Sequence, residues 1–297
     1  MDRASLFPHP SVMAILYLVS TPIGNLGDLS PRAGGVLGSV SRILAEDTRR
    51  TRTLLAHLGL NTPMVSLHAH NEAAREAKIL RWLGEGEDLA LVSDAGTPLV
   101  SDPGNRLLGA VLDQGHRVVP IPGPSAVLAA LVASGLPTDR FSFLGFPPRK
   151  GKERQALLTR LSMAEETMVL FESPERLGSL LEALVEAGGR DRKCAVAREL
   201  TKLHEEFLRG TVGELAEHFR GNPPRGEITL VLGAASSGPG TREVDQEAGA
   251  ALARVLLERG SRPSQAAREV ARRLGISRNQ AYALVQGLSE GRAPDGE

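Results

Sequence analysis

Aromatic residues are scarce: phenylalanine, tryptophan and tyrosine together make up 3% of the 297 residues. We therefore do not expect flat aromatic platforms to dominate any contact with single-stranded nucleic acid. An excess of charge of one sign is lacking as well, because 35 basic residues balance 35 acidic ones. Affinity for a polyanion would have to come from local basic patches rather than from the charge of the whole chain.

Cysteine occurs once, at Cys194. A lone thiol excludes an internal disulfide and any cysteine-cluster metal site, and it suits the reducing cytoplasm. No apolar run approaches the length that a membrane span needs, and the first residues lack the hydrophobic core of a signal peptide. We predict a cytoplasmic protein that does not contact a membrane. Residues 1–13 show no periodicity and are predicted to be a disordered lead-in.

Over residues 14–135, apolar runs typical of strands buried on both faces alternate with stretches of helical spacing. This alternation predicts an N-terminal α/β lobe with a largely parallel sheet between helices. Residues 136–234 repeat such elements in a less regular order, which predicts a second, more mixed C-terminal α/β lobe. Strands are predicted at 15–20, 42–45, 65–67, 89–92 and 118–121 in the first lobe and at 168–171, 194–199, 206–210 and 228–232 in the second.

The last part of the chain has a different composition. Residues 235–242 are rich in glycine and serine and are predicted to be a linker. Residues 243–297 form a basic module in which one helix is predicted to end at Gly275, and a capping box of Ser277 and Gln280 begins another. We predict a small module that resembles a helix-turn-helix, used for docking RNA or for contact between subunits.

Three loops rich in glycine, proline and small residues follow predicted strands of the first lobe, at 20–28, 93–98 and 122–126. Ligands of parallel sheets bind beyond the carboxyl ends of the strands, where all three loops fall. Small residues let a ligand approach the backbone closely, and prolines fix the loops in advance. No phosphate-binding P-loop or G-x-G-x-x-G motif is present, so a nucleoside without a phosphate chain is the expected ligand.

Long motifs run through both lobes. The first lobe carries LVSTPIGNLGD at 18–28, AEDTR at 45–49, SDAGTPLVSDPG at 93–104 and PGPSA at 122–126, and the second carries FESPER at 171–176, RELTK at 198–202 and GE at 226–227. In order and spacing these motifs resemble the tetrapyrrole-methylase superfamily, and within it the branch that methylates small-subunit ribosomal RNA. The resemblance covers residues 14 to 233.

The resemblance implies a two-lobed fold of the tetrapyrrole-methylase type, a homodimer, and S-adenosylmethionine as cofactor. It implies methyl transfer to the 2′-hydroxyl of a cytidine in 16S ribosomal RNA, either free or in the assembled small subunit. Cofactor contacts carried over by motif are Ile23, Asp94, Ala95, Gly96, Thr97, Val100, Ser125 and Ala126 in the first lobe and Phe171, Ala197 and Ile228 in the second. Many members of the wider superfamily have Gly-Asp-Pro where this chain has Gly-Thr-Pro at 96–98, and this difference supports the ribosomal branch. The chain lacks the superfamily's acidic contact at that point, unless Asp94 replaces it.

Methyl transfer from a sulfonium is an in-line displacement, so alignment of the reacting atoms supplies much of the rate. A ribose hydroxyl is a poor nucleophile and needs a base, or a lysine that stabilises the oxyanion. The candidates are Asp47, Arg49, Lys202 and Glu227, which lie in matched motifs near strand ends. The alternative for Asp47 and Arg49 is a carboxylate at a helix start with its salt-bridge partner.

Candidate RNA contacts are Arg149, Lys150 and Lys152 in a basic loop, His70, and Arg272 and Arg273 in the basic module. The basic loop is equally consistent with a solvated connector between the lobes. His68, His70 and Glu72 have no evident fourth ligand, so no metal site is predicted.

Two other functions remain open from the sequence. One is a methylase of the same fold that acts on a tetrapyrrole or on the modified histidine of elongation factor two, the diphthamide precursor. The other is a non-catalytic regulator that binds nucleic acid through the basic module, which would leave the three loops without a ligand.

Overall fold

The computed structural model describes residues 14–235, 246–258, 261, 263–274, 281–282 and 284–286, with the backbone alone for 246–248, 272 and 274. The predicted lead-in at 1–13, and the predicted linker apart from its first residue, lie outside the described residues. None of the helices within the described ranges combines the length and the apolar character that a bilayer crossing needs.

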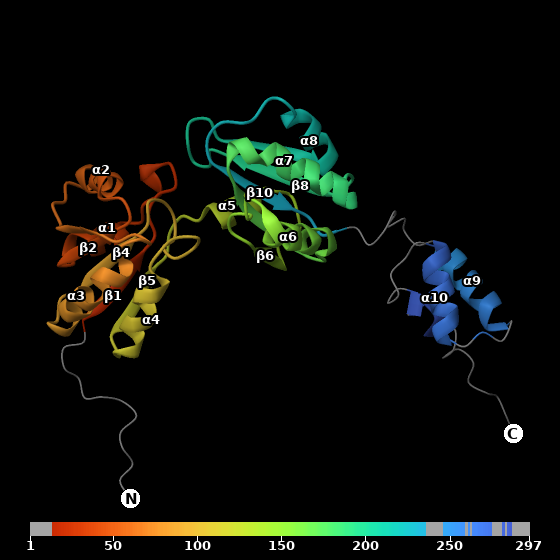
Figure 1. Ribbon diagram of the computed structural model, residues 1–297, viewed down its shortest axis with the longest axis horizontal. Helices are drawn as coiled ribbons and strands as arrows, with labels where there is room; N and C mark the ends of the chain where they lie inside the picture. Colours follow the sequence, from red (N-terminus) through yellow and green to blue (C-terminus); the bar gives the residue numbers. More distant parts are fainter. Residues whose placement is uncertain are drawn as a thin grey trace, which may run out of the picture.

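A parallel sheet forms the centre of the first lobe, in the order β3-β2-β4-β1-β5 (Figure 1). Its strands are β1 (Ile15–Val19), β2 (Arg42–Ala45), β3 (Met64–Ser66), β4 (Leu89–Val92) and β5 (Arg117–Ile121). The four residues of β4 are all buried, as expected of a strand inside a sheet that is covered on both faces. The predicted parallel sheet is therefore present in the first lobe.

Helices cover both faces of this sheet and give the lobe three layers. The helical elements are η1 (Leu26–Asp28), α1 (Pro31–Ser39), α2 (Thr48–Leu58), α3 (Glu72–Gly84) and α4 (Asn105–Asp113). Leu37 of α1 and Leu55 of α2 pack on one face, and Ile79 of α3 and Leu107 of α4 pack on the other. The Ser30 hydroxyl caps α1 by accepting from the Ala33 amide at 3.1 Å.

The second lobe has a mixed sheet in the order β6-β7-β10-β8-β9. Its strands are β6 (Phe141–Phe143), β7 (Thr167–Glu172), β8 (Lys193–Arg198), β9 (Glu206–Thr211) and β10 (Ile228–Leu232). β6 pairs with β7 in parallel, and the other pairs are antiparallel. One face is covered by α6 (Gly151–Met163), α7 (Pro174–Leu184), the turn η2 (Val185–Gly189) and α8 (Val212–Phe219).

Helix α5 (Ala126–Ala133) covers the opposite face of the second sheet. Its side chains Val127, Ala130 and Leu131 pack with Val169 and Val231 of that sheet. The structure thus differs from a division of the chain after residue 135, since α5 packs with the second lobe. The sequence of α5, AVLAALVA, is apolar on every side and so carries no signal of the sheet that it covers.

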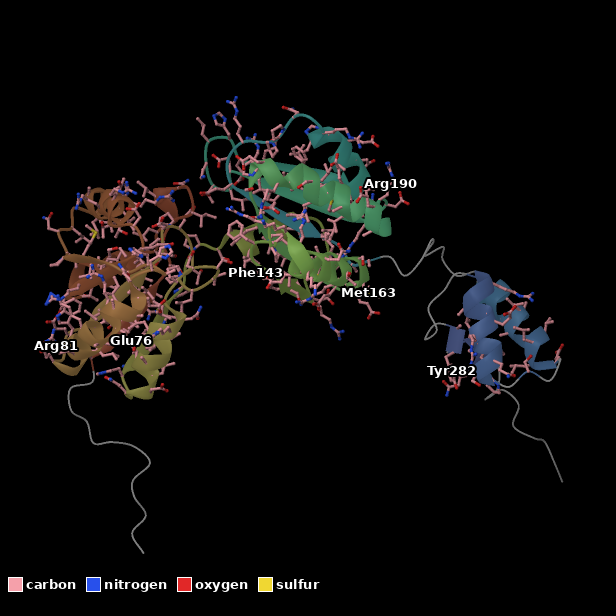
Figure 2. The ribbon with its side chains drawn as sticks, viewed as in Figure 1. Glu76, Arg81, Phe143, Met163, Arg190 and Tyr282 are labelled. Carbon is pink, nitrogen blue, oxygen red and sulfur yellow. The ribbon has the colours of Figure 1, made fainter. Side chains whose placement is uncertain are left out.

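Figure 2 shows Phe143 on the side of the second lobe that faces the first, with Met163 and Arg190 at the other end. Farther along the chain, α9 (Gln246–Glu258) and α10 (Pro263–Leu274) pack through Ala253, Ala266 and Val270. Ala281 and Val285 belong to the same small core. The predicted helix end at Gly275 and the capping box of Ser277 and Gln280 lie outside the described residues.

Candidate active site

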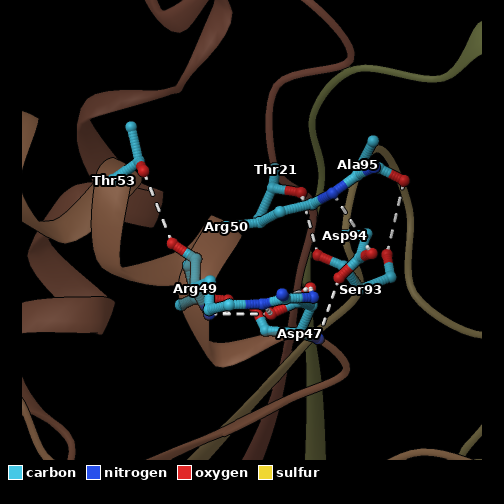
Figure 3. Close-up of polar contacts among 9 residues, drawn as sticks. Thr21, Asp47, Arg49, Arg50, Thr53, Ser93, Asp94 and Ala95 are labelled. Atoms are coloured by element: carbon cyan, nitrogen blue, oxygen red, sulfur yellow. Dashed lines mark hydrogen bonds and ion pairs between the residues drawn. The ribbon is translucent and has the colours of Figure 1, made fainter.

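The three glycine- and proline-rich loops meet at one edge of the first sheet. They follow β4, β1 and β5, which are neighbours in the sheet. The backbones of Thr21 and Gly96 exchange two hydrogen bonds of 2.9 and 3.0 Å, and the Thr97 hydroxyl donates to the Pro124 carbonyl at 3.2 Å. Figure 3 shows Thr21 beside the segment from Ser93 to Ala95. The predicted convergence of the loops is therefore present.

A cavity of about 360 Å³ lies between these loops and the second lobe. Its volume is within the range of small-molecule sites. The first lobe contributes Ile23, Arg50, Asp94, Ala95, Gly96, Thr97, Val100, Ser101, Asp102 and Ser125, the start of α5 contributes Ala126 and Val127, and the second lobe contributes Phe146, Phe171, Glu172, Ser173, Pro174, Gly226, Glu227, Ile228 and Thr229.

Every residue that the sequence motifs assign to the cofactor lines this cavity, except Ala197. Ala197 is fully buried and belongs to the core between α5 and the second sheet. It pairs with Thr229 in the next strand, and Thr229 lines the cavity in its place. The motif locates Ala197 near the site, but Ala197 lies in β8, and the neighbouring strand β10 borders the cavity instead.

Close approach between backbones shapes the wall formed by the loops. Gly96 has a φ of +80°, and a Cβ there would lie 3.3 Å from Cγ2 of Ile23 and 3.7 Å from the Pro124 carbonyl oxygen. A Cβ at Gly123 would lie 2.9 Å from the Ser20 Cβ. Both positions favour glycine, and at Gly96, which lines the cavity, bare backbone can face a ligand.

Backbone strain is concentrated beside the cavity. In the described part of the chain, four residues other than glycine have a left-handed φ: Leu99 (72°), Ser101 (70°), Glu199 (51°) and Thr201 (65°). The first two lie in the loop after β4 and the other two in the loop after β8. Each costs about 1–2 kcal/mol, a cost that the surrounding fold sustains and that commonly marks functional sites.

Asp47 and Arg49, two of the predicted catalytic residues, form a helix cap (Figure 3). The Asp47 carboxylate accepts from the Arg49 amide at 2.8 Å and from its guanidinium at 2.6 Å. These bonds hold the pKa of Asp47 at about 2. Neither side chain lines the cavity, which is the geometry of a helix-start carboxylate with its salt-bridge partner. The Asp47 amide in turn donates to the Asp94 carboxylate at 2.9 Å, so the cap supports a residue that does line it.

The other two predicted catalytic residues, Lys202 and Glu227, lie together on the second-lobe side of the cavity. The Lys202 ammonium donates to Glu199 at 2.8 Å and to Glu227 at 3.1 Å. Burial lowers the pKa of Lys202, but the hydrogen bonds to Glu199 and Glu227 outweigh it and raise the pKa above its ordinary value. Glu227 lines the cavity, and the Lys202 side chain packs against Gly24 of the first lobe. The structure thus places the four candidates in two separate pairs.

Four charged or aromatic residues of the cavity are not among those predicted from the sequence. Arg50 pairs with Asp94 at 3.5 Å, and Glu172 is fully buried in an ion pair with Arg176. Asp102 is half-buried and Phe146 is 58% exposed at the lining. Asp102 and Glu172 lie inside the matched motifs and Arg50 directly follows one, so the motifs hold a signal for the region but none for the direction of each side chain.

Comparison with known proteins separates the candidate families. A family model described as Tetrapyrrole (Corrin/Porphyrin) Methylases matches residues 15–216. The Ribosomal RNA small subunit methyltransferase I of Synechocystis sp. is 46% identical, over 92% of this chain and 97% of the relative. The protein of that name from Escherichia coli O157:H7 is 42% identical, over 90% and 93%. This chain belongs to the ribosomal RNA small subunit methyltransferase I family of tetrapyrrole methylases.

Solved structures agree with that membership at the level of the fold. A cobalt precorrin-4 methyltransferase has a TM-score of 0.58 and 20% identity, over 77% of this chain and 98% of that chain. A diphthine synthase has a TM-score of 0.57 and 15% identity, over 74% and 90%. The predicted two-lobed tetrapyrrole-methylase fold is confirmed.

The charge of the cavity is consistent with the ligand of a methyltransferase of this family. Four carboxylates line it, those of Asp94, Asp102, Glu172 and Glu227, against the single lining cation Arg50 among the described residues. An acidic lining favours a cationic ligand. The apolar side chains of Ile23 and Ile228 and the bare backbone at Gly96 suit a nucleoside. The residues present therefore fit S-adenosylmethionine, which joins an adenosyl group to a sulfonium.

The predicted RNA contacts are at the surface. Arg149, Lys150 and Lys152 are exposed at the start of α6, a few residues beyond Phe146 of the cavity. His70 is exposed before α3, and its ring lies 5.9 Å from that of His68. Arg273 is exposed and pairs with Glu269 at 2.6 Å, while the Arg272 side chain lies outside the described residues.

Proposed function

We propose that this protein transfers a methyl group from S-adenosylmethionine to the 2′-hydroxyl of a cytidine in 16S ribosomal RNA. The observation that carries the proposal is the cavity, whose loops hold the residues assigned to the cofactor. The chain is also 46% identical to a Ribosomal RNA small subunit methyltransferase I over nearly its whole length. The substrate is the small-subunit RNA, free or within the assembled subunit. The expected compartment is the cytoplasm.

The first-lobe loops hold the cofactor in this proposal. The backbone from Asp94 to Thr97 and the residues Ser125 and Ala126 contact it from one side, and Phe171 and Ile228 close over it from the other. The bound sulfonium supplies an activated methyl group with a good leaving group. The protein's own contribution is to fix the methyl carbon in line with the ribose oxygen and to exclude water.

The two polar pairs beside the cavity have different tasks in the proposed reaction. Glu227 reaches the cavity while its hydrogen bond to Lys202 fixes its carboxylate, so this pair orients the ribose or stabilises charge on its oxygen. Asp47 and Arg49 lie behind Asp94 and position that residue through the Asp47 amide. They are positioning residues in this proposal.

RNA is proposed to approach along the exposed basic side chains Arg149, Lys150 and Lys152, with His70, Arg272 and Arg273 as further contacts. The basic loop leads directly into the segment that carries Phe146, so phosphates bound there would bring the adjoining nucleotide to the cavity. A homodimer, the oligomer implied by the motifs, would present two such surfaces.

The alternatives are less well supported. Tetrapyrrole and diphthine enzymes share the fold at 15–23% identity, whereas the two relatives named above for ribosomal RNA are 46% and 42% identical. A non-catalytic regulator would not need three loops and a second lobe built around a ligand cavity.

The test is a methyl-transfer assay with the full chain, labelled S-adenosylmethionine, and 16S RNA or small subunits that lack the modification. We expect label in one cytidine as a 2′-O-methyl group, mapped by mass spectrometry of RNA fragments. Thermal stabilisation by S-adenosylhomocysteine, but not by NAD or ATP, is the expected binding result. Label on a base, on protein or on a tetrapyrrole instead would exclude the proposed function.

A further inference from the structure

Three of the four carboxylates that line the cavity are held by a basic side chain. Asp94 pairs with Arg50 at 3.5 Å, Glu227 pairs with Lys202 at 3.1 Å, and Glu172 pairs with Arg176. Asp102 is different: in the described part of the chain it has no ion pair, and its polar partner is the Ser93 hydroxyl. A carboxylate without a cation keeps its affinity for a proton.

The loop that carries Asp102 is held in a strained conformation. Leu99 and Ser101 both have left-handed backbones, and Gly104, with a φ of +118°, begins α4 directly afterwards. The Leu99 side chain packs against Gly104, which has no side chain to block it. The Ser101 hydroxyl lies close to Gly145 of the second lobe, and a Cβ at Gly145 would lie 3.1 Å from it. Strain sustained at this point fixes Asp102 at the junction of the two lobes, facing the cavity.

The surroundings of Asp102 also favour its protonated form. Partial burial raises its pKa, and the negative charge of Asp94 raises it further, while the Ser93 hydroxyl opposes both. The pKa of Asp47 is held at about 2, and hydrogen bonds from Lys202 and Glu227 lower that of Glu199. Glu46 also has a raised pKa, but it does not line the cavity. A base must accept a proton near the working pH, which Asp47 and Glu199 do poorly.

The geometry points to Asp102 as the general base that takes the proton from the ribose 2′-hydroxyl. This inference rests on the proposed function and names the group that completes its chemistry. The Asp102 carboxylate accepts the hydroxyl proton as the ribose oxygen forms its bond to the methyl carbon. The bond between that carbon and sulfur breaks, its electron pair stays on sulfur, and the neutral thioether leaves.

Asp102→Asn is the direct test, because the amide has the shape of the carboxylate and cannot take the proton. Asp113→Asn is the matched control, the same change at an exposed residue at the end of α4, away from the cavity. We expect Asp102→Asn to lower kcat about 100-fold or more, in the range of general-base catalysis, with little change in the affinities for S-adenosylhomocysteine and for RNA. Asp113→Asn should match the wild type in all three.

Two further measurements do not depend on that variant being active. The pKa of the Asp102 carboxyl, followed by ¹³C NMR and assigned by its loss in Asp102→Asn, should lie above the ordinary value for aspartate. Asp94→Asn removes the negative charge that raises it, so both this pKa and the acid limb of the pH–kcat profile should move to lower pH. If Asp102→Asn does not fold, that paired shift decides the matter, with the signal assigned from sequential connectivities.

The contrary outcomes are distinct. Unchanged kcat in Asp102→Asn overturns the inference, and so does a pKa at or below the ordinary value. A third outcome is that Asp102→Asn binds S-adenosylmethionine less tightly than wild type does, binds S-adenosylhomocysteine as wild type does, and keeps its kcat at saturating cofactor. That result would make Asp102 a contact for the sulfonium and not a base. If the wild type itself methylates no ribose in 16S RNA, the proposed function fails, and the pKa measurement still reports on Asp102.

Discussion

The two lobes contribute to the cavity in different ways. The first lobe supplies a wall of backbone, with three loops joined by hydrogen bonds and glycines where a Cβ would collide, and Arg50, Asp94 and Asp102 add charge to that wall. The second lobe supplies charged side chains that are already paired, such as Glu172 with Arg176 and Glu227 with Lys202. Backbone recognises shape and tolerates little change, whereas paired side chains tune charge. Loss of a first-lobe glycine should therefore weaken ligand binding, and loss of a paired side chain in the second lobe should mainly change stability and rate.

Among the variants that compare the two lobes, Gly96→Ala is expected to have the largest effect. The added Cβ would press on Ile23 and the Pro124 carbonyl, and the left-handed backbone at φ +80° disfavours any side chain. Affinity for S-adenosylhomocysteine, measured by calorimetry, should fall by about tenfold or more, because a shift of a few tenths of an ångström there displaces the loop that contacts the ligand.

Gly115→Ala is the control for Gly96→Ala. Its φ of +76° is nearly the same, but a Cβ there meets nothing within 4 Å. Both variants should lose about 1 kcal/mol of stability from backbone strain. Only Gly96→Ala should lose affinity, and equal losses of affinity would show that the tight contact at Gly96 is unimportant.

The contrast between the lobes also explains what could be predicted from the sequence. Convergence of the first-lobe loops follows from strand–loop–helix order and turn residues, since parallel strands end at a common edge. The direction of Asp102 depends on left-handed conformations at Leu99 and Ser101, and neither residue type signals such a conformation.

Other positions needed the tertiary structure as well. Arg49 and Arg50 are adjacent at a helix start, and only the packing of α2 decides that Arg50 lines the cavity while Arg49 faces solvent. Ala197 directly precedes a matched motif, yet strand order puts it in the core. Sequence patterns locate such segments but do not decide which side chain reaches the ligand. On a helix, neighbouring side chains point about 100° apart, and in a sheet the order of the strands decides which strand borders the ligand.

A smaller effect is expected for Lys202→Met in the second lobe. The change leaves Glu199, whose side chain is 20% exposed, and Glu227 without their shared cation. The free energy of unfolding should fall by about 1–3 kcal/mol, because a partly buried carboxylate loses its hydrogen-bond donor. Urea unfolding measures this loss.

Arg190→Met gives the comparison for Lys202→Met in the same lobe. Arg190 pairs with Glu217 at 3.2 Å, and both side chains are more than half exposed. Such surface pairs contribute roughly 0–1 kcal/mol. Equal destabilisation by the two variants would contradict a special role for the pair beside the cavity.

The smallest expected effect is that of Asp47→Asn, and it depends on pH. The pKa of Asp47 is lowered from its ordinary value near 3.8 to about 2, first of all by the hydrogen bond from the Arg49 side chain. The folded protein therefore binds this proton less readily than the unfolded chain does, so the charged form stabilises the fold above pH 3.8 and the contribution is lost as the pH falls toward 2. Wild type and variant should differ slightly in melting temperature at neutral pH and converge on acidification, because an exposed pair is screened by solvent. A difference that persists or grows below pH 3 would mean that Asp47 acts through its shape as a helix cap and not through its charge.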